Sequence, residues 1–106
     1  MTWVVDSLGR TIELREPGRA ERRRLHRIAG SRVHSIPYMF AGHLLMSVAT
    51  LGGQVVKVRT EHDLERLAGE VGDAGLAAIL SGWQSAGWIS EIVEANASPS
   101  AIGGQE

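Results

Sequence analysis

Residues 60–83 read TEHDLERLAGEVGDAGLAAILSGW, and this stretch decides which fold the sequence predicts. Apolar residues recur three and four positions apart on both sides of a glycine-bounded corner at residues 72–75, and that spacing places them on one face of a helix. Thr60 followed by Asp63 is a capping-box pattern, which marks the start of a helix. We therefore predict two amphipathic helices, over residues 60–71 and 74–86, that meet at this corner.

The first 30 residues predict a β-hairpin and then a helix. Two short runs of strand-forming residues flank a D-S-L-G-R turn at residues 6–10, where Asp and Ser side chains can bond the turn and Gly can adopt a positive φ. We predict a hairpin over residues 2–15, ended by Pro17 because the residue before a proline favours extended backbone. Helical spacing then runs over residues 18–29.

A central helix is predicted over residues 37–51. Pro37 suits the first turn of a helix, and apolar residues cover nearly all faces of this segment, which is typical of a helix buried in the core. We interpret Gly52 and Gly53 as the end of this helix, and residues 54–58 as an extended connector.

Together these elements predict an α+β fold that is mostly α, with an N-terminal β-hairpin followed by about four short helices around one core. A chain of 106 residues is long enough for one modest core. We expect a single globular domain over residues 1–95. Residues 96–106 are expected to form a flexible tail, because small and polar residues replace the apolar pattern there.

The composition excludes several kinds of chemistry. The chain has no cysteine, which rules out disulfides, thiol nucleophiles and cysteine-based zinc sites. Its histidines show no metal-ligand spacing, and its glycines form no phosphate-binding loop. The longest apolar run, residues 36–51, is shorter than a membrane span and contains a proline. We therefore expect no enzyme activity, no metal, no cofactor and no membrane partner.

Arginines are the strongest polar feature of the sequence. Residues 1–34 carry eight arginines and four acidic residues, whereas residues 35–106 carry three basic and eight acidic residues. The first predicted helix gathers a candidate polyanion face: Arg19, Arg22, Arg23 and Arg27. This face can bind phosphates, or it can be a solvated face that complements the acidic part of the chain. The absence of lysine and aromatic residues from this helix favours the second interpretation, so nucleic acid is not the expected partner.

Two groups of apolar residues are candidates for binding a partner protein. Three bulky residues stand at consecutive positions of the central helix and cannot all face one core. A second group follows two glycines near the end of the last helix, where it can either pack in the core or form an exposed interaction patch. The candidates are Tyr38, Met39, Phe40, Trp88, Ile89 and Ile92.

A family resemblance rests on motifs spread along residues 4–80. They are the D-S-L-G-R turn at residues 6–10, Arg24-Leu25 and Ala29-Gly30 in the basic helix, and Leu64, Leu67, Gly72-Asp73 and Gly75-Leu76-Ala77-Ala78 in the helical corner. In this order, the chain resembles the small tail assembly chaperones of long-tailed bacteriophages and prophages.

The resemblance implies a non-enzymatic function in the cytoplasm of a bacterial host. Such proteins are similar to holdases for the tape measure protein, a long helical polypeptide that fixes tail length. Many occur in a short form and in a frameshift-extended form whose added part contacts the tail tube protein, and this chain would correspond to the short form. The role is physically reasonable, because capturing a helix requires an apolar strip and no catalytic group.

Two alternatives remain from the residues alone. The first is a small nucleic-acid-associated protein that uses the arginine-rich helix face. The second is a homo-oligomeric structural subunit, in which the basic helix of one copy meets the acidic helices of the next. Phosphate binding weakens steeply with ionic strength whereas apolar helix capture does not, so a salt series separates the first alternative from the chaperone.

Overall fold

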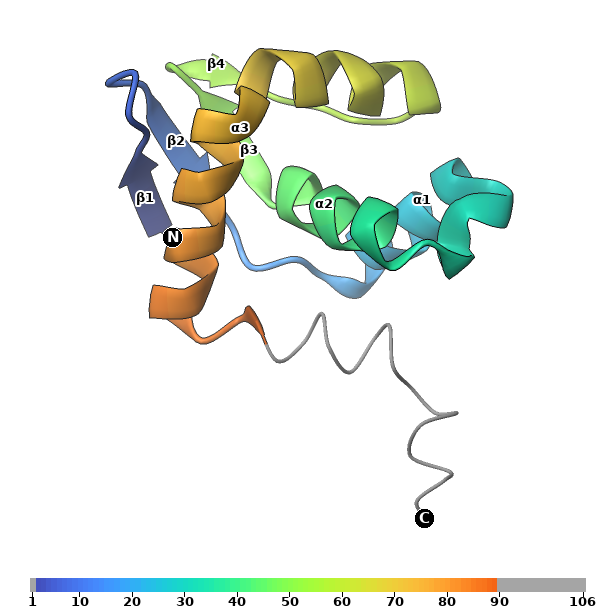
Figure 1. The fold of residues 1–106 in the computed structure, drawn as a ribbon. Helices are drawn as coiled ribbons and strands as arrows, with labels where there is room; N and C mark the ends of the chain where they lie inside the picture. Colours follow the sequence, from blue (N-terminus) through green and yellow to red (C-terminus); the bar gives the residue numbers. More distant parts are fainter. Residues whose placement is uncertain (1, 90–106) are drawn as a thin grey trace.

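The computed structural model describes residues 2–89 and has an α+β architecture that is mostly helical (Figure 1). The described elements are β1 (Thr2–Val5), β2 (Thr11–Leu14), α1 (Arg19–Ala29), the 3-10 helix η1 (Gly30–His34), α2 (Ile36–Met46), β3 (Val48–Leu51), β4 (Gln54–Val55) and α3 (Glu61–Ala86). The predicted N-terminal hairpin and first helix are confirmed. The structure adds a sheet that the sequence did not indicate.

The sheet has four antiparallel strands in the order β1-β2-β3-β4. Its inner face packs against the C-terminal half of α3, which crosses the strands in Figure 1. The approach is close, because a Cβ atom placed on Gly82 would lie 2.7 Å from Val4 Cγ1 and 2.9 Å from Leu14 Cδ1. Ile12 and Leu14 are therefore fully buried on this face, and alternation along the strands puts their neighbours on the opposite face.

The predicted central helix over residues 37–51 is wrong at its C-terminal end, residues 47–51. Helix α2 ends at Met46, and Val48–Leu51 forms strand β3 instead. The β-branched residues of this segment favour extended backbone, and β2 offers a free edge that supplies hydrogen bonds to it, as from Gly52 N to Thr11 O (2.8 Å). Pairing with a distant strand therefore outweighed the local helical pattern.

Gly52 and Gly53, which we interpreted as a helix end, form the turn of a second hairpin. Their φ angles are 58° and 86°, and two successive positive φ values are what a two-residue hairpin turn requires. Only Gln54–Val55 of the expected connector becomes a strand, β4. The remaining residues run irregularly to α3.

The two helices predicted at residues 60–71 and 74–86 are joined in the structure as the single kinked helix α3. The kink lies at Gly72, whose φ of 64° and ψ of −174° are non-helical, and Figure 1 shows the two halves running in different directions. The predicted count of about four helices thus becomes three α-helices among the described residues.

The capping box at the start of α3 is confirmed. The Thr60 hydroxyl accepts a hydrogen bond from Asp63 N (3.1 Å), and the Asp63 carboxylate accepts from Thr60 N (3.3 Å). The Arg59 N–H also donates to this carboxylate (3.1 Å), and this bond is the main cause that lowers the pKa of Asp63 below its ordinary value.

The buried residues form one cluster with a polar contact at its centre. Trp83 is fully buried, as its position in the apolar stripe of α3 indicates. Its Nε1–H donates to the hydroxyl of buried Ser47 (2.9 Å), which in turn donates to Leu44 O (2.6 Å). This chain of bonds satisfies the indole and ties α3 to the C-terminal end of α2.

Two expectations cannot be compared with the fold. Ile92 and the tail over residues 96–106 lie outside the described residues. Within residues 2–89, no helix is long and apolar enough to cross a membrane.

Replacing Ser47 with alanine should lower the free energy of unfolding by about 1–3 kcal/mol, because the buried Trp83 Nε1–H loses its acceptor. Urea denaturation of the purified chain measures this change. Ser85→Ala removes an exposed hydroxyl from the same helix as Trp83 and should alter stability by less than about 0.5 kcal/mol. Equal effects of the two variants would contradict a structural role for the Ser47 hydroxyl.

Candidate functional site

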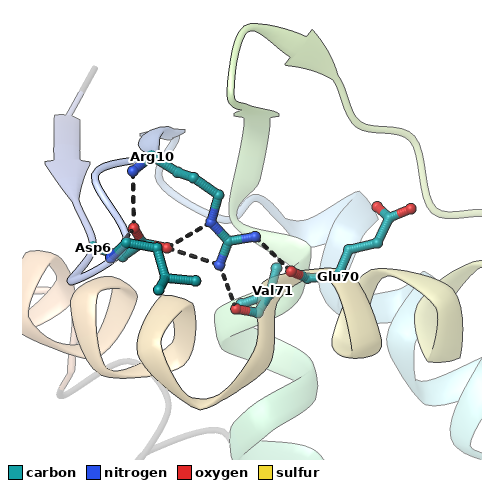
Figure 2. Close-up of polar contacts among 5 residues, drawn as sticks. Asp6, Arg10, Glu70 and Val71 are labelled. Atoms are coloured by element: carbon teal, nitrogen blue, oxygen red, sulfur yellow. Dashed lines mark hydrogen bonds and ion pairs between the residues drawn. The ribbon is translucent and has the colours of Figure 1, made fainter.

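The turn between β1 and β2 is held by Asp6 (Figure 2). One carboxylate oxygen accepts hydrogen bonds from the backbone N–H groups of Leu8 (3.0 Å) and Arg10 (2.9 Å). The other accepts from the guanidinium of Arg10, at 2.8 Å from Nε and 2.7 Å from Nη2. The Asp6 side chain is fully inaccessible to solvent. The D-S-L-G-R motif is therefore a structural turn in which Asp6 orients the guanidinium of Arg10.

Arg10 reaches from this turn to the kink of α3. Its Nη1 donates to Glu70 O (2.6 Å) and its Nη2 to Val71 O (2.8 Å), immediately before Gly72. Figure 2 shows the guanidinium between the Asp6 carboxylate and these two carbonyls. We call this set of contacts the Arg10 clamp. It joins the hairpin to α3 at the point where the helix changes direction.

Two opposing effects act on the pKa of Asp6. Removal from water raises this pKa and is the largest single effect. The hydrogen bonds donated by Arg10 and by the Leu8 backbone together outweigh it, so the pKa lies below its ordinary value of 3.8. The carboxylate is therefore charged at neutral pH and matched to the guanidinium.

Beside the clamp, β1 and the C-terminal half of α3 enclose an open groove of about 460 Å³. On the α3 side its wall consists of small residues spaced three and four positions apart. The lining residues are Val4, Val5, Asp6 and Ser7 on the hairpin, and Ala74, Ala77, Ala78 and Ser81 on α3. We call it the β1 groove. Its chemistry is apolar apart from two hydroxyls and the Asp6 carboxylate that Arg10 already occupies.

The outer face of the sheet carries apolar residues at its two edges and polar residues between them. Trp3 is opposite Glu13, Glu13 is opposite Thr50, and Thr50 is opposite Val55, so these side chains form one row across the sheet. Trp3 and Val5 are 59% and 64% exposed. Because β1 is an edge strand, Val5 belongs both to this outer face and to the rim of the β1 groove.

The first sequence-predicted apolar group is only partly accessible. Met39 is buried in the core at 1% exposure, so its side chain is not part of the accessible surface in this structure. Tyr38 and Phe40 are half-buried and pack against the core. The guanidinium of Arg32 lies 4.6 Å above the centre of the Tyr38 ring, which covers part of that surface.

The second predicted group packs at the end of α3. Trp88 is half-buried and meets Trp83 edge to face, with ring centres 5.7 Å apart. Ile89 is also half-buried against the core. These two residues therefore belong largely to the core.

The candidate polyanion face lies along α1. Arg19, Arg23 and Arg27 are exposed, whereas Arg22 is half-buried and interacts with another residue. Arg32, beyond this face, forms an ion pair with Glu61, and their hydrogen bond is the main cause that raises the pKa of Arg32. The predicted row is thus an exposed face of α1.

Sequence reasoning missed the most exposed large apolar residues: Trp3, Val5, Leu8, Ile36 and Val55. The exposure of Trp3 and Val5 could have been predicted from the hairpin, because successive strand residues point to opposite faces and Val4 packs against the core. Trp3 and Val5 must then point the other way.

No group of three or more acidic or histidine side chains within residues 2–89 is placed to hold a metal ion. Searches of protein-family models, curated proteins and solved structures found no match to this chain.

Replacing Arg10 with alanine should reduce the free energy of unfolding by about 2 kcal/mol, because two carbonyls and the buried Asp6 carboxylate lose a charged donor. Chemical denaturation measures the loss. Arg23→Ala removes the same charge from the exposed face of α1 and should change stability by less than about 0.5 kcal/mol. Similar losses in both variants would mean that the Arg10 clamp does not stabilise the fold.

The lowered pKa of Asp6 predicts an acid-sensitive fold. The stabilisation by this carboxylate is fully present above its unfolded-state pKa of 3.8 and is lost as the pH falls through the lower folded-state pKa. Asp6→Asn should therefore be less stable than the wild type at neutral pH and should lose less stability on acidification. Urea titrations between neutral and acidic pH measure both effects.

A matched variant separates this effect from a general loss of charge. Asp73→Asn also removes one carboxylate, but Asp73 is exposed. The loss of unfolding free energy on acidification should be the same in this variant as in the wild type. In both proteins that loss includes the contribution of Asp63. If Asp6→Asn follows the wild type equally well, Asp6 is not the source of the acid sensitivity.

Proposed function

We propose that this protein is a non-enzymatic tail assembly chaperone of a long-tailed bacteriophage or prophage, which binds an amphipathic helical segment of the tape measure protein. The observation that carries the proposal is the open apolar β1 groove, with exposed Trp3 and Val5 beside it. An apolar groove on a stable scaffold is a common way of capturing one face of a helix.

The shape of the groove supports a helical occupant. Packed helices lie about 8–10 Å apart, and small side chains at the contact permit the closest approach. The α3 wall consists of alanines and a serine, so a second helix can lie against it without displacing bulky side chains. Val4 and Val5 supply apolar contact from the opposite wall, and Trp3 extends that surface across the outer face of the sheet.

The location of the groove also agrees with the family resemblance. Its hairpin wall includes Asp6 and Ser7 of the D-S-L-G-R motif, and its helical wall includes Ala77 and Ala78 of the motif in α3. Two of the motifs that carry the resemblance therefore contribute to the two walls of one groove, and the Arg10 clamp joins their segments. This juxtaposition supports a shared binding role for them.

A holdase function follows from these properties. The tape measure protein would expose apolar helical faces before tail tube subunits cover it, and transient binding to an apolar groove would keep those faces from aggregating. The tail tube protein is a possible second partner by the same resemblance. The expected location is the cytoplasm of the bacterial host, where tails assemble.

Co-expression of the tagged chain with its neighbouring genes tests this function, with retained proteins identified by mass spectrometry and a tape measure protein expected among them. We expect capture that persists from about 0.1 M to about 1 M NaCl, because apolar binding is not weakened by salt. Nucleic acid retained only at low salt, without the tape measure protein, would favour the alternative in which the α1 arginines bind a polyanion.

A charge placed in the groove tests the site. Ala77 is exposed in the groove wall, so Ala77→Glu should leave the fold intact and lower capture at least about tenfold, because a carboxylate would be buried against an apolar helix. Ala20→Glu makes the same change on exposed α1 and should retain capture. A folded Ala77→Glu protein with unchanged capture would exclude the β1 groove as the binding site.

A further inference from the structure

Four cationic side chains from three separate segments line one small pocket. Its volume is about 160 Å³, and the lining residues are Arg15, Arg24, Lys57, Val58 and Arg59. Arg15 directly follows β2, Arg24 lies on α1, and the other residues belong to the connector between β4 and α3. We call this the basic pocket. No acidic residue is among those that line it.

Buried neighbours explain why these side chains converge. Val58 is buried at 7% exposure, whereas Lys57 and Arg59 on either side of it are exposed. Arg15 follows fully buried Leu14, and its N–H donates to Ser47 O (2.9 Å). The backbone of each segment is therefore fixed by the core rather than by the charged groups.

Arg24 is positioned in the same way from α1. It precedes Leu25, which is fully buried, and one helical residue corresponds to a rotation of about 100°. Arg24 therefore lies on the flank of α1, beside the core-facing side, and is half-buried. Arg19 and Arg23 are on the exposed side and do not line the basic pocket.

The four cationic side chains are not paired with a carboxylate in the described part of the chain. None of their side chains makes a hydrogen bond or ion pair with residues 2–89, in contrast to Arg10 and Arg32, which pair with Asp6 and Glu61. Two carboxylates lie near them. Glu21 lines an adjoining cavity together with Arg15 and Arg24, and one of its oxygens accepts from Gly18 N (2.9 Å). Asp63 accepts from the backbone N–H of Arg59 (3.1 Å) at the start of α3.

We infer that the basic pocket binds a multiply charged phosphate group, as carried by a phosphomonoester or a polyphosphate. Such a group has a charge of about −1.5 to −2 at neutral pH and three strong acceptor oxygens, whereas a carboxylate has a single charge. Three guanidinium groups and one ammonium match the higher charge, and the planar donor fork of arginine fits phosphate oxygens in pairs. The lining has no aromatic or amide side chain that could read a nucleic-acid base.

This site is independent of the proposed chaperone function. The β1 groove lies between β1 and the C-terminal half of α3, and it shares no lining residue with the basic pocket. Salt also separates the two sites. It weakens phosphate binding, which depends on charge, and does not weaken helix capture, which depends on apolar contact.

Calorimetric titration of the full chain with inorganic pyrophosphate at low salt tests the inference. We expect saturable binding to one site. The double variant Arg15→Gln/Arg59→Gln should weaken it at least about tenfold, because two charge-assisted donors are lost. The matched variant Arg19→Gln/Arg23→Gln removes the same charge from exposed α1 and should stay within about twofold of the wild type. Circular dichroism confirms that both variants are folded.

Three results would overturn the inference: no saturable binding of pyrophosphate, equal weakening by both double variants, or equally tight binding of a glutamate-rich peptide. A separate titration uses duplex DNA. If pyrophosphate does not bind and DNA binding depends on Arg19 and Arg23, the anion site is the α1 face instead. Titration with a phosphoserine peptide separates the two sources of the ligand. Tighter binding of that peptide supports a phosphorylated partner, and tighter binding of pyrophosphate supports a free polyphosphate.

Discussion

The arrangement of the hairpin and α3 depends on the guanidinium of Arg10. The non-helical backbone at Gly72 interrupts the regular pattern of α3 and leaves carbonyl acceptors where the helix bends. A guanidinium has five donors in a planar fork, so one arginine can serve two carbonyls and a carboxylate at once. Asp6 holds that fork in position and balances its charge. A small chain without disulfides thereby joins two distant segments through charge-assisted bonds.

The Arg10 clamp also determines the functional surface that we propose. By setting the direction of the C-terminal half of α3, it places a wall of small residues beside the edge strand β1 and so creates the β1 groove. Two of the motifs behind the resemblance, the D-S-L-G-R turn and the alanines of α3, lie in the walls of this groove. The basic pocket lies on other elements, so an apolar partner and a phosphate can bind the same molecule through different forces.

The elements that the sequence predicted well are those specified by neighbouring residues. The hairpin is specified by a turn that Asp6, within the turn itself, stabilises. Helix α3 starts directly after Thr60 because the capping box involves only Thr60 and Asp63, three residues apart. The bend at Gly72 was likewise visible as a glycine at a helical junction. Strand β3 was missed because its hydrogen bonds come from β2, more than thirty residues earlier, and a local apolar pattern does not distinguish a buried helix from a buried strand.

The sequence by itself determined the class of the fold, the hairpin turn, the end of α1 at Ala29 and the start of α3 after Thr60, since local hydrogen bonds and apolar periodicity specify these features. Only the tertiary structure decided which apolar residues stay exposed and which charges meet. Trp3 is exposed because α3 packs on the opposite face of the sheet, whereas Met39 on α2 is buried in the core. The basic pocket exists because three segments, each fixed by its own buried neighbours, end at the same place, and no local pattern encodes that meeting.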